Sequence, residues 1–229
     1  MHMRNWVGTL LLLVAMTAWA KREAPPAAPA AQPGFLDVQA DAATARVVVG
    51  VHALDAPMLM VTALPGALGS NDVGLDRNQS GEPKLVEFRR LGKKLLLVQR
   101  NMKFIADSAD VDEAMSARDA FAEAVLWSGD LLNPDDVHGL WRVDLSSLIA
   151  SDLHGVADRL RGTQQGGYTL DAGRSGVLAA AAKAYPDNVE FEALLTFAGS
   201  GDGAFVQQAV ADARAITLRQ QLSFVRLPD

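Results

Sequence analysis

The 229-residue chain contains no cysteine. It therefore forms no disulfide, offers no thiolate to zinc and has no cysteine nucleophile. Positive charge is also in short supply, since 21 Lys and Arg residues stand against 27 Asp and Glu residues and the formal net charge is −6. Nucleic-acid binding requires a clustered positive surface, so this composition disfavours DNA or RNA as a partner.

Several catalytic signatures are also missing. The chain has no H-E-x-x-H pair, the arrangement that places two imidazoles and a general base on one helix face, and no G-x-x-x-x-G-K-[ST] phosphate loop. Ser175, in "GRSGV", lacks the final glycine of a G-x-S-x-G elbow and is predicted to be a turn residue. Isolated histidines are usually structural, but a zinc site assembled in three dimensions from His52, His138 and His154 stays an alternative. We therefore assign no catalytic, cofactor-binding or metal residue to this chain.

The first twenty residues have the pattern of a signal peptide. One arginine precedes a short apolar run, and Ala18 and Ala20 occupy the −3 and −1 positions of a cleavage site. The run is short for a membrane-spanning helix, although an uncleaved anchor remains the alternative. Residues 21–34 are rich in Pro and Ala and are predicted to form an extended linker. We expect an exported protein, periplasmic or extracellular, with one domain over residues 35–229 and no stable membrane span after cleavage.

Periodicity and turn signals over residues 35–229 favour an α+β fold, mostly antiparallel β-sheet with two or three short inserted helices. The clearest signal is a hairpin over 84–99, with a two-residue turn at Leu91-Gly92. Val189, Phe191, Ala193 and Leu195 alternate with Glu190, Glu192 and Leu194, as in a strand with one buried face. Further strands are predicted at 46–52, 58–63, 168–171, 175–181, 188–199 and 215–227, and helices at 116–127 and 152–162. Residues 139–149 are predicted to be a strand that runs into a short helical turn.

Two groups of charges could belong to a site. Arg89, Arg90, Lys93 and Lys94 cluster at the tip of the hairpin, where they form either a patch for an acidic ligand or an ordinary solvated end. Carboxylates recur in short clusters such as Glu190 with Glu192, which would share the wet face of their strand. Neither group identifies a reaction, because one sequence does not reveal which side chains converge in a cleft.

The stretch from Gly66 to Pro83, "GALGSNDVGLDRNQSGEP", is the most unusual segment of the chain. Within and beyond it, Asp76 to Glu87 places Asp, Asn, Ser, Gly and Glu at positions 1, 3, 5, 6 and 12 of an EF-hand loop. Pro83 and the strand patterns on both sides disfavour the two helices that an EF-hand requires. A long turn between strands and a ligand-binding loop both remain open, since long loops are often functional.

Seven blocks, in order, resemble the N-terminal domain of unknown function of large bacterial exported zinc-dependent metalloproteases. The resemblance covers residues 36–229. The blocks are "GALGSNDVGLDRNQ", "VEFRRLGKKLLLVQRNMKFIA", "AFAEAVLWS", "SDLHGVADRLRG", "YTLDAGRSGV", "YPDNVEFEALLTF" and "ITLRQQLSFVRLPD".

This resemblance implies a catalytic domain with H-E-x-x-H beyond the region it covers, so zinc is expected there and no catalytic residue is carried over to this chain. The chain would then be a non-catalytic module, or a truncated or split product, with a metallopeptidase domain as its protein partner in cis or encoded downstream. The glycine-rich stretch 66–83 is the block expected to contact that partner. The alternative is a stand-alone exported β-rich binding or interaction protein, and the sequence leaves enzymatic activity of the chain itself undecided.

Overall fold

The computed structural model describes residues 29–103, 112, 120–134 and 139–228, and strands dominate them. Strands account for 45% of these residues and helices for 14%. The strands are β1 (Asp37–Asp41), β2 (Arg46–Val51), β3 (Met58–Gly66), β4 (Lys84–Leu91), β5 (Lys94–Gln99), β6 (Ala124–Asp130), β7 (Trp141–Asp144), β8 (Tyr168–Leu170), β9 (Gly176–Val177), β10 (Lys183–Ala184), β11 (Asn188–Gly199) and β12 (Ala215–Arg226). The helices are α2 (Ser146–Ile149), α3 (Val156–Gly162), α4 (Ala204–Ala209) and the 3-10 turns η1 (Ala172–Arg174) and η2 (Ala179–Ala181).

The expected α+β class is wrong. The fold is a mostly antiparallel β-structure, a curled half-barrel with few helices. The clearest cause is the helix predicted over 116–127. Its last four residues belong to β6, in which Trp127 pairs with Leu97 and Val125 pairs with Val98 of β5. A short apolar run fits helical and strand spacing equally well, and pairing with β5 decides between them. Residues 116–119 of that prediction lie outside the described part of the chain.

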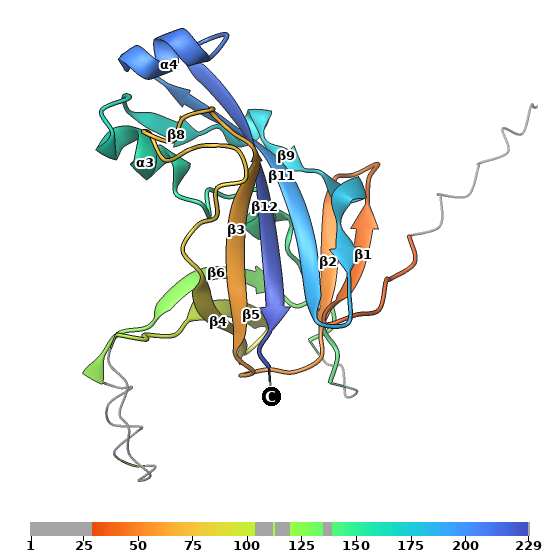
Figure 1. The fold of residues 1–229 in the computed structure, drawn as a ribbon. Helices are drawn as coiled ribbons and strands as arrows, with labels where there is room; N and C mark the ends of the chain where they lie inside the picture. Colours follow the sequence, from red (N-terminus) through yellow and green to blue (C-terminus); the bar gives the residue numbers. More distant parts are fainter. Residues whose placement is uncertain (1–28, 104–111, 113–119, 135–138, 229) are drawn as a thin grey trace, which may run out of the picture.

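The larger sheet has nine strands, in the order β10-β11-β12-β3-β4-β5-β6, with β8 and β9 also paired to β11. Its two longest strands are β11 and β12, which pair over eleven residues from Asn188↔Val225 to Ala198↔Ala215. Figure 1 shows these two strands and β3 running side by side through the length of the molecule. The strand β3 meets β4 only between Met58 and Met60, and from there β4, β5 and β6 turn away from the long strands.

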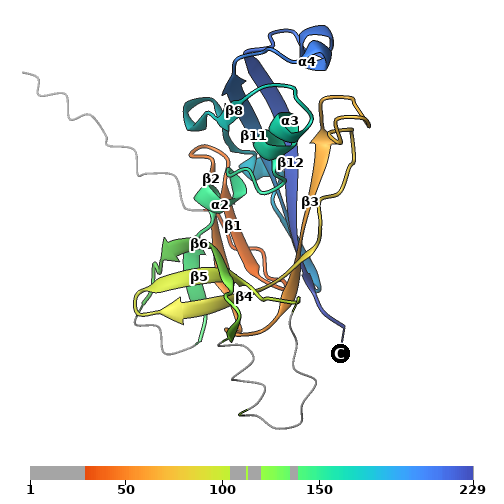
Figure 2. The same cartoon turned by 90° about the vertical axis from the view of Figure 1, so that its left-hand side faces the viewer.

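The smaller sheet, β1-β2-β7, bridges the two ends of the larger one. At one end, Leu131 after β6 pairs with Val143 of β7. At the other end, the N–H of Phe35 donates to the carbonyl of Tyr185 after β10, at 2.7 Å. Figure 2 shows β1 and β2 on the inner side of β11 and β12. The two sheets therefore enclose one hydrophobic core, which includes Val49 of the smaller sheet and Phe191 of the larger.

The predicted hairpin and the predicted alternation of β11 are confirmed. Val189, Phe191 and Leu195 are buried in the core, while Glu190 and Glu192 lie on the opposite face. The hairpin turn falls one residue later than predicted, at Gly92-Lys93, and Gly92 has the positive φ (59°) that such a turn requires.

The N-terminal predictions fall mostly outside the described residues. These are the signal peptide at 1–20 and residues 21–28 of the linker. The end of the linker, residues 29–34, contacts the fold: Gln32 pairs with Val38 of β1, and the side-chain amide of Gln39 donates to the carbonyl of Pro29 at 2.8 Å. Among the described residues, no helix is long and apolar enough to cross a membrane.

Candidate functional site

The glycine-rich stretch 66–83 is built into the fold as an edge of the larger sheet. Its residues 78–81 run beside the C-terminal half of β3, at Thr62 to Leu64. The N–H of Asn78 donates to the carbonyl of Leu64 at 2.8 Å, and the N–H of Gly81 donates to the carbonyl of Thr62 at 2.8 Å. Leu68, Val73 and Leu75 of the same stretch are buried in the core. The stretch thus covers an edge that β4 leaves open, and it is anchored by apolar side chains.

The EF-hand spacing does not correspond to an EF-hand. The segment lies between strands β3 and β4, where an EF-hand has helices. Glu87, at the position of the bidentate ligand, is 1% exposed and lies in β4. Its two carboxylate oxygens accept from Arg89 and Arg100, each at 2.5 Å. Glu87 is therefore the centre of a buried ion-pair network, and calcium coordination is not its role.

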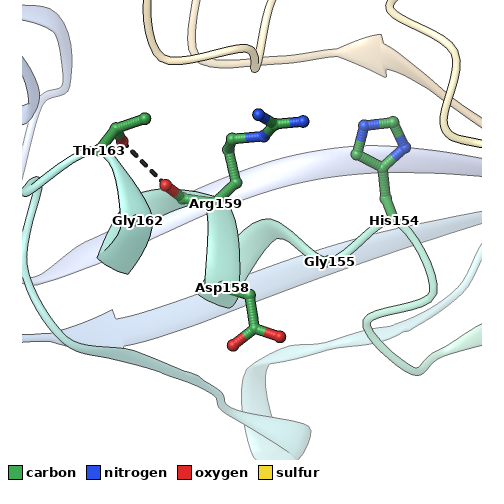
Figure 3. A pocket seen from close by; sticks show the side chains of 6 residues that line it. All are labelled: His154, Gly155, Asp158, Arg159, Gly162 and Thr163. Atoms are coloured by element: carbon green, nitrogen blue, oxygen red, sulfur yellow. Dashed lines mark hydrogen bonds between the residues drawn. The ribbon is translucent and has the colours of Figure 1, made fainter.

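A hollow of about 410 Å³ lies beside this stretch, along α3 and the turn that precedes it. Its lining residues are His154, Gly155, Asp158, Arg159, Gly162 and Thr163 (Figure 3). The turn is held by Asp152, whose carboxylate accepts from the N–H groups of Gly155, Val156 and Ala157 at 2.8–2.9 Å. The predicted helix 152–162 therefore begins at Val156, and its first four predicted residues form the turn.

His154 is fixed from two directions by inward-facing polar side chains of the larger sheet. Its Nδ1 lies 3.1 Å from Oγ1 of Thr62 in β3. Its backbone N–H donates to Oε1 of Gln220 in β12 at 2.9 Å, and Gln220, which is 1% exposed, donates in turn to the carbonyl of Ser151. Burial lowers the pKa of His154 and the nearby Arg159 lowers it further, while Asp152 opposes both effects. His154 is thus a neutral imidazole at pH 7 with its Nε2 uncommitted among the described residues.

Two glycines of the stretch 66–83 lie against side chains that line the hollow. A Cβ at Gly81 would lie 2.4 Å from Oγ1 of Thr62 and 3.3 Å from Nδ1 of His154. A Cβ at Gly74, whose φ is +71°, would lie 3.2 Å from Cζ of Arg159. Both positions therefore need glycine because the backbone of the stretch approaches the side chains of the hollow closely. Two of the glycines in the stretch are therefore explained by its close packing against Thr62, His154 and Arg159.

The other sequence candidates have structural partners. Ser175 donates to the carbonyl of Asp171 and accepts from the N–H of Thr196, as expected for a turn residue. His52 pairs with Asp37 at 3.0 Å, and His138 lies outside the described residues. At the hairpin tip, Arg90 stacks on Trp141, with Cζ 4.5 Å from the ring centroid. Within the described ranges, no cluster of three His, Asp or Glu side chains is arranged for a metal ion.

Comparison with known proteins identifies the family. Residues 78–229, which are two thirds of the chain, match the family described as "Domain of unknown function (DUF5117)". The chain belongs to this family. No curated protein and no solved structure matches it.

Sequence reasoning did not single out Arg159 or the hollow. "SDLHGVADRLRG" contains His154 and Arg159 five residues apart, which is an ordinary pattern for a capped surface helix. The glycines that face them, Gly74 and Gly81, are remote in sequence. Only the pairing of residues 78–81 with β3 brings the two segments together. No local signal would have revealed this.

Proposed function

We propose that this chain is a non-catalytic module of an exported zinc-dependent metalloprotease, and that it packs against the catalytic domain of that enzyme. The sequence resemblance supplies the identity of the partner. The structural observation that supports docking is that β3 is apolar on both faces. Met58, Met60 and Leu64 enter the core, whereas Leu59 and Val61 point outward.

The outward apolar residues form a continuous patch. Leu59 pairs laterally with Leu85 of β4 on one side and with Val225 of β12 on the other, and all three are half-buried. Val61 and Ala63 continue the patch along β3. The exposed face of an antiparallel sheet is normally polar, so an apolar outer face favours a covering partner. We name this set, Leu59, Val61, Ala63, Leu85 and Val225, the outer patch.

Figures 1 and 2 are consistent with an accessible outer patch. The segment carrying α2 and α3 lies on the inner side of the larger sheet, where Gln220 contacts the carbonyls of Ile149 and Ser151. No described helix lies over the outer face of β3 and β12. A protein domain could therefore approach this face without displacing any described element.

The alternative is a stand-alone exported β-rich binding protein. One observation favours it: among the described residues, every buried side-chain nitrogen and oxygen has a hydrogen-bond partner. A domain with a fully satisfied interior does not depend on a partner to complete its core. Both proposals expect the isolated chain to fold, so stability alone does not separate them.

Binding to the catalytic domain separates the two proposals. The test measures affinity between the purified chain and a metallopeptidase domain containing H-E-x-x-H that is encoded in cis or directly downstream. We expect binding, and we expect Val61→Lys in the outer patch to weaken it by about tenfold or more, since it places a charge in an apolar contact. Thr169→Lys, at an exposed position of β8, is the matched control and should bind as the unmodified protein does.

Absence of any binding by the unmodified chain would overturn the module proposal in favour of the stand-alone protein. Binding that Val61→Lys and Thr169→Lys leave equally unchanged would retain the partner but overturn the outer patch as its docking surface. Circular dichroism of each variant checks that the fold is retained.

A further inference from the structure

We propose that the hollow beside α3 is a binding site for an oxyanion, a carboxylate or phosphate group, held by the guanidinium of Arg159 and by Nε2 of His154. This site is separate from the outer patch and does not depend on the proposed docking function. The residues that would hold the anion lie on the inner side of the larger sheet, whereas the outer patch lies on its other face.

The first step is the unmatched charge of Arg159. Among the described residues, its guanidinium makes no hydrogen bond and no ion pair, although a guanidinium has five N–H donors. The two nearest carboxylates in sequence are engaged elsewhere. Asp158 pairs with Arg161 at 2.7 Å, and Asp152 accepts three backbone N–H groups of the turn before α3. The guanidinium of Arg159, which is exposed, is therefore available to a ligand.

The second step is the direction of the side chains. Figure 3 shows the imidazole of His154 and the guanidinium of Arg159 on the same side of the segment, while the carboxylate of Asp158 points to the opposite side. The backbone of the stretch 66–83 approaches both side chains, with Gly74 next to the guanidinium of Arg159 and Gly81 next to the imidazole of His154. Two donors thus share one side of the hollow, and the adjacent carboxylate is turned away from them.

The third step is the chemical form of His154. Nδ1 is occupied by Thr62, so Nε2 is the ring nitrogen available to a ligand. If the hydroxyl of Thr62 donates to Nδ1, Nε2 carries the proton and is a donor. A bound anion selects this tautomer, because the other tautomer would place a lone pair against the negative charge. An oxyanion then accepts from both Nε2–H and the planar fork of Arg159, the geometry that suits carboxylate and phosphate groups.

The size of the hollow suits a small charged group with some attached structure. About 410 Å³ is within the range of small-molecule pockets. Its lining is polar and includes Thr163 and Asp158, so the ligand would be held by charge and hydrogen bonds more than by apolar contact. We therefore expect weak binding of a bare anion and tighter binding of a molecule that presents the anion on a polar body.

The experiment is a titration of the uniformly ¹⁵N-labelled protein at constant ionic strength. One arm uses inorganic phosphate, and a second uses N-acetyl-alanyl-alanine as a carboxylate on a peptide, with the corresponding C-terminal amide as the uncharged control. We expect saturable shifts of the amide signals of Gly74, Gly81, Gly155 and Gly162, and a change of the His154 ring nitrogens toward the Nε2–H form. The arm that saturates at the lower concentration identifies the source of the anion.

Arg159→Ala should weaken binding by about tenfold or more, as loss of a charge-assisted hydrogen bond predicts, and Arg159→Lys should weaken it less. Arg219→Ala, which removes an arginine that pairs with Glu192 on the opposite face of the larger sheet, is the matched control and should leave affinity unchanged. Shifts that do not saturate, that occur equally with the amide control, or that persist in Arg159→Ala would overturn the proposal. Amide-signal dispersion of each variant confirms that it is folded.

Discussion

At the scale of single residues, the most costly group in the described interior is Glu87. It is 1% exposed, and an isolated buried carboxylate would be strongly destabilising. Arg89 and Arg100 neutralise it from two sides, and Arg89 extends the network to Glu123 through two further hydrogen bonds. These contacts raise the pKa of Arg89 further above its usual range, with the bond to Glu123 as the largest cause. The network holds β4 and β5 together with the segment that precedes β6.

Replacing Glu87 should destabilise the protein markedly. Glu87→Ala would leave two partly buried guanidinium groups without their shared acceptor, and we expect a loss of about 2–4 kcal/mol in the free energy of unfolding. Urea titration at pH 7 measures it. Glu192→Ala is the control, because Glu192 is half-buried and pairs with Arg219 at 3.4 Å near the surface. Glu192→Ala should lower the free energy of unfolding by less than about 1 kcal/mol. Equal losses in both variants would contradict a special role for Glu87.

His154 should make stability depend on pH. Burial lowers its pKa in the folded state below the ordinary value of 6.5, so the unfolded chain binds its proton more readily. Stability therefore falls as pH decreases from about 7 toward 5. Asp41, Asp144 and Asp171 have lowered pKa values as well, and their contribution is lost only at lower pH, below about 4.

Urea titrations at pH 7.5 and pH 5.5 test this by giving the free energy of unfolding at each pH. The difference between the two free energies of unfolding should shrink in His154→Gln. If the pH dependence of stability is unchanged in His154→Gln, another titratable group causes it.

At the scale of elements, the stretch 66–83 covers the edge of β3 and packs against two residues that line the hollow, His154 and Arg159. Its buried Leu75 is 0% exposed. Leu75→Ala should cost about 2–4 kcal/mol in the free energy of unfolding, as for other fully buried leucines, whereas Asp72→Ala at an exposed position of the same stretch should cost little. Thermal or urea unfolding of both variants measures the difference. A stretch that tolerates Leu75→Ala as well as Asp72→Ala would be an independent loop.

The sequence predicted the elements whose signals are local and missed those that depend on distant pairing. The hairpin 84–99 was recognisable because Gly92 permits the turn, and β11 because Val189, Phe191 and Ala193 alternate with Glu190 and Glu192. β6 was misassigned because Val125, Leu126 and Trp127 fit either periodicity, and β5 decides the outcome. β1 and α4 gave no signal that was recognised. The candidate site was missed for the same reason, since Gly74 and Arg159 meet only through tertiary structure.

At the scale of the whole molecule, two sheets share one core and should unfold together. Leu131 with Val143, and Phe35 with Tyr185, join the sheets at their two ends. Two of the four tryptophans, Trp127 in β6 and Trp141 in β7, pack against this core near the first of these joins. In a protein lacking residues 1–20 they are the only tryptophans. Tryptophan fluorescence then reports on the contact between the two sheets at Leu131 and Val143. Fluorescence and far-ultraviolet circular dichroism should give coincident urea transitions. A separate early fluorescence transition would mean that the smaller sheet unfolds on its own.

The pairing of β3 with β12 has a consequence for the order of folding. Met58 lies opposite Arg226, so the strand at the centre of the sheet meets its main neighbour only after the residues up to Arg226 have been synthesised. Until then β3 is a nascent segment, apolar on both faces, with its hydrogen-bonding groups unsatisfied along one side. Closing such a long loop is entropically slow, and exposed strands of this kind promote aggregation. Folding of this domain should therefore be limited by the synthesis of β12, and a chaperone that shields β3 until then would raise the yield more than any stabilisation of the finished fold.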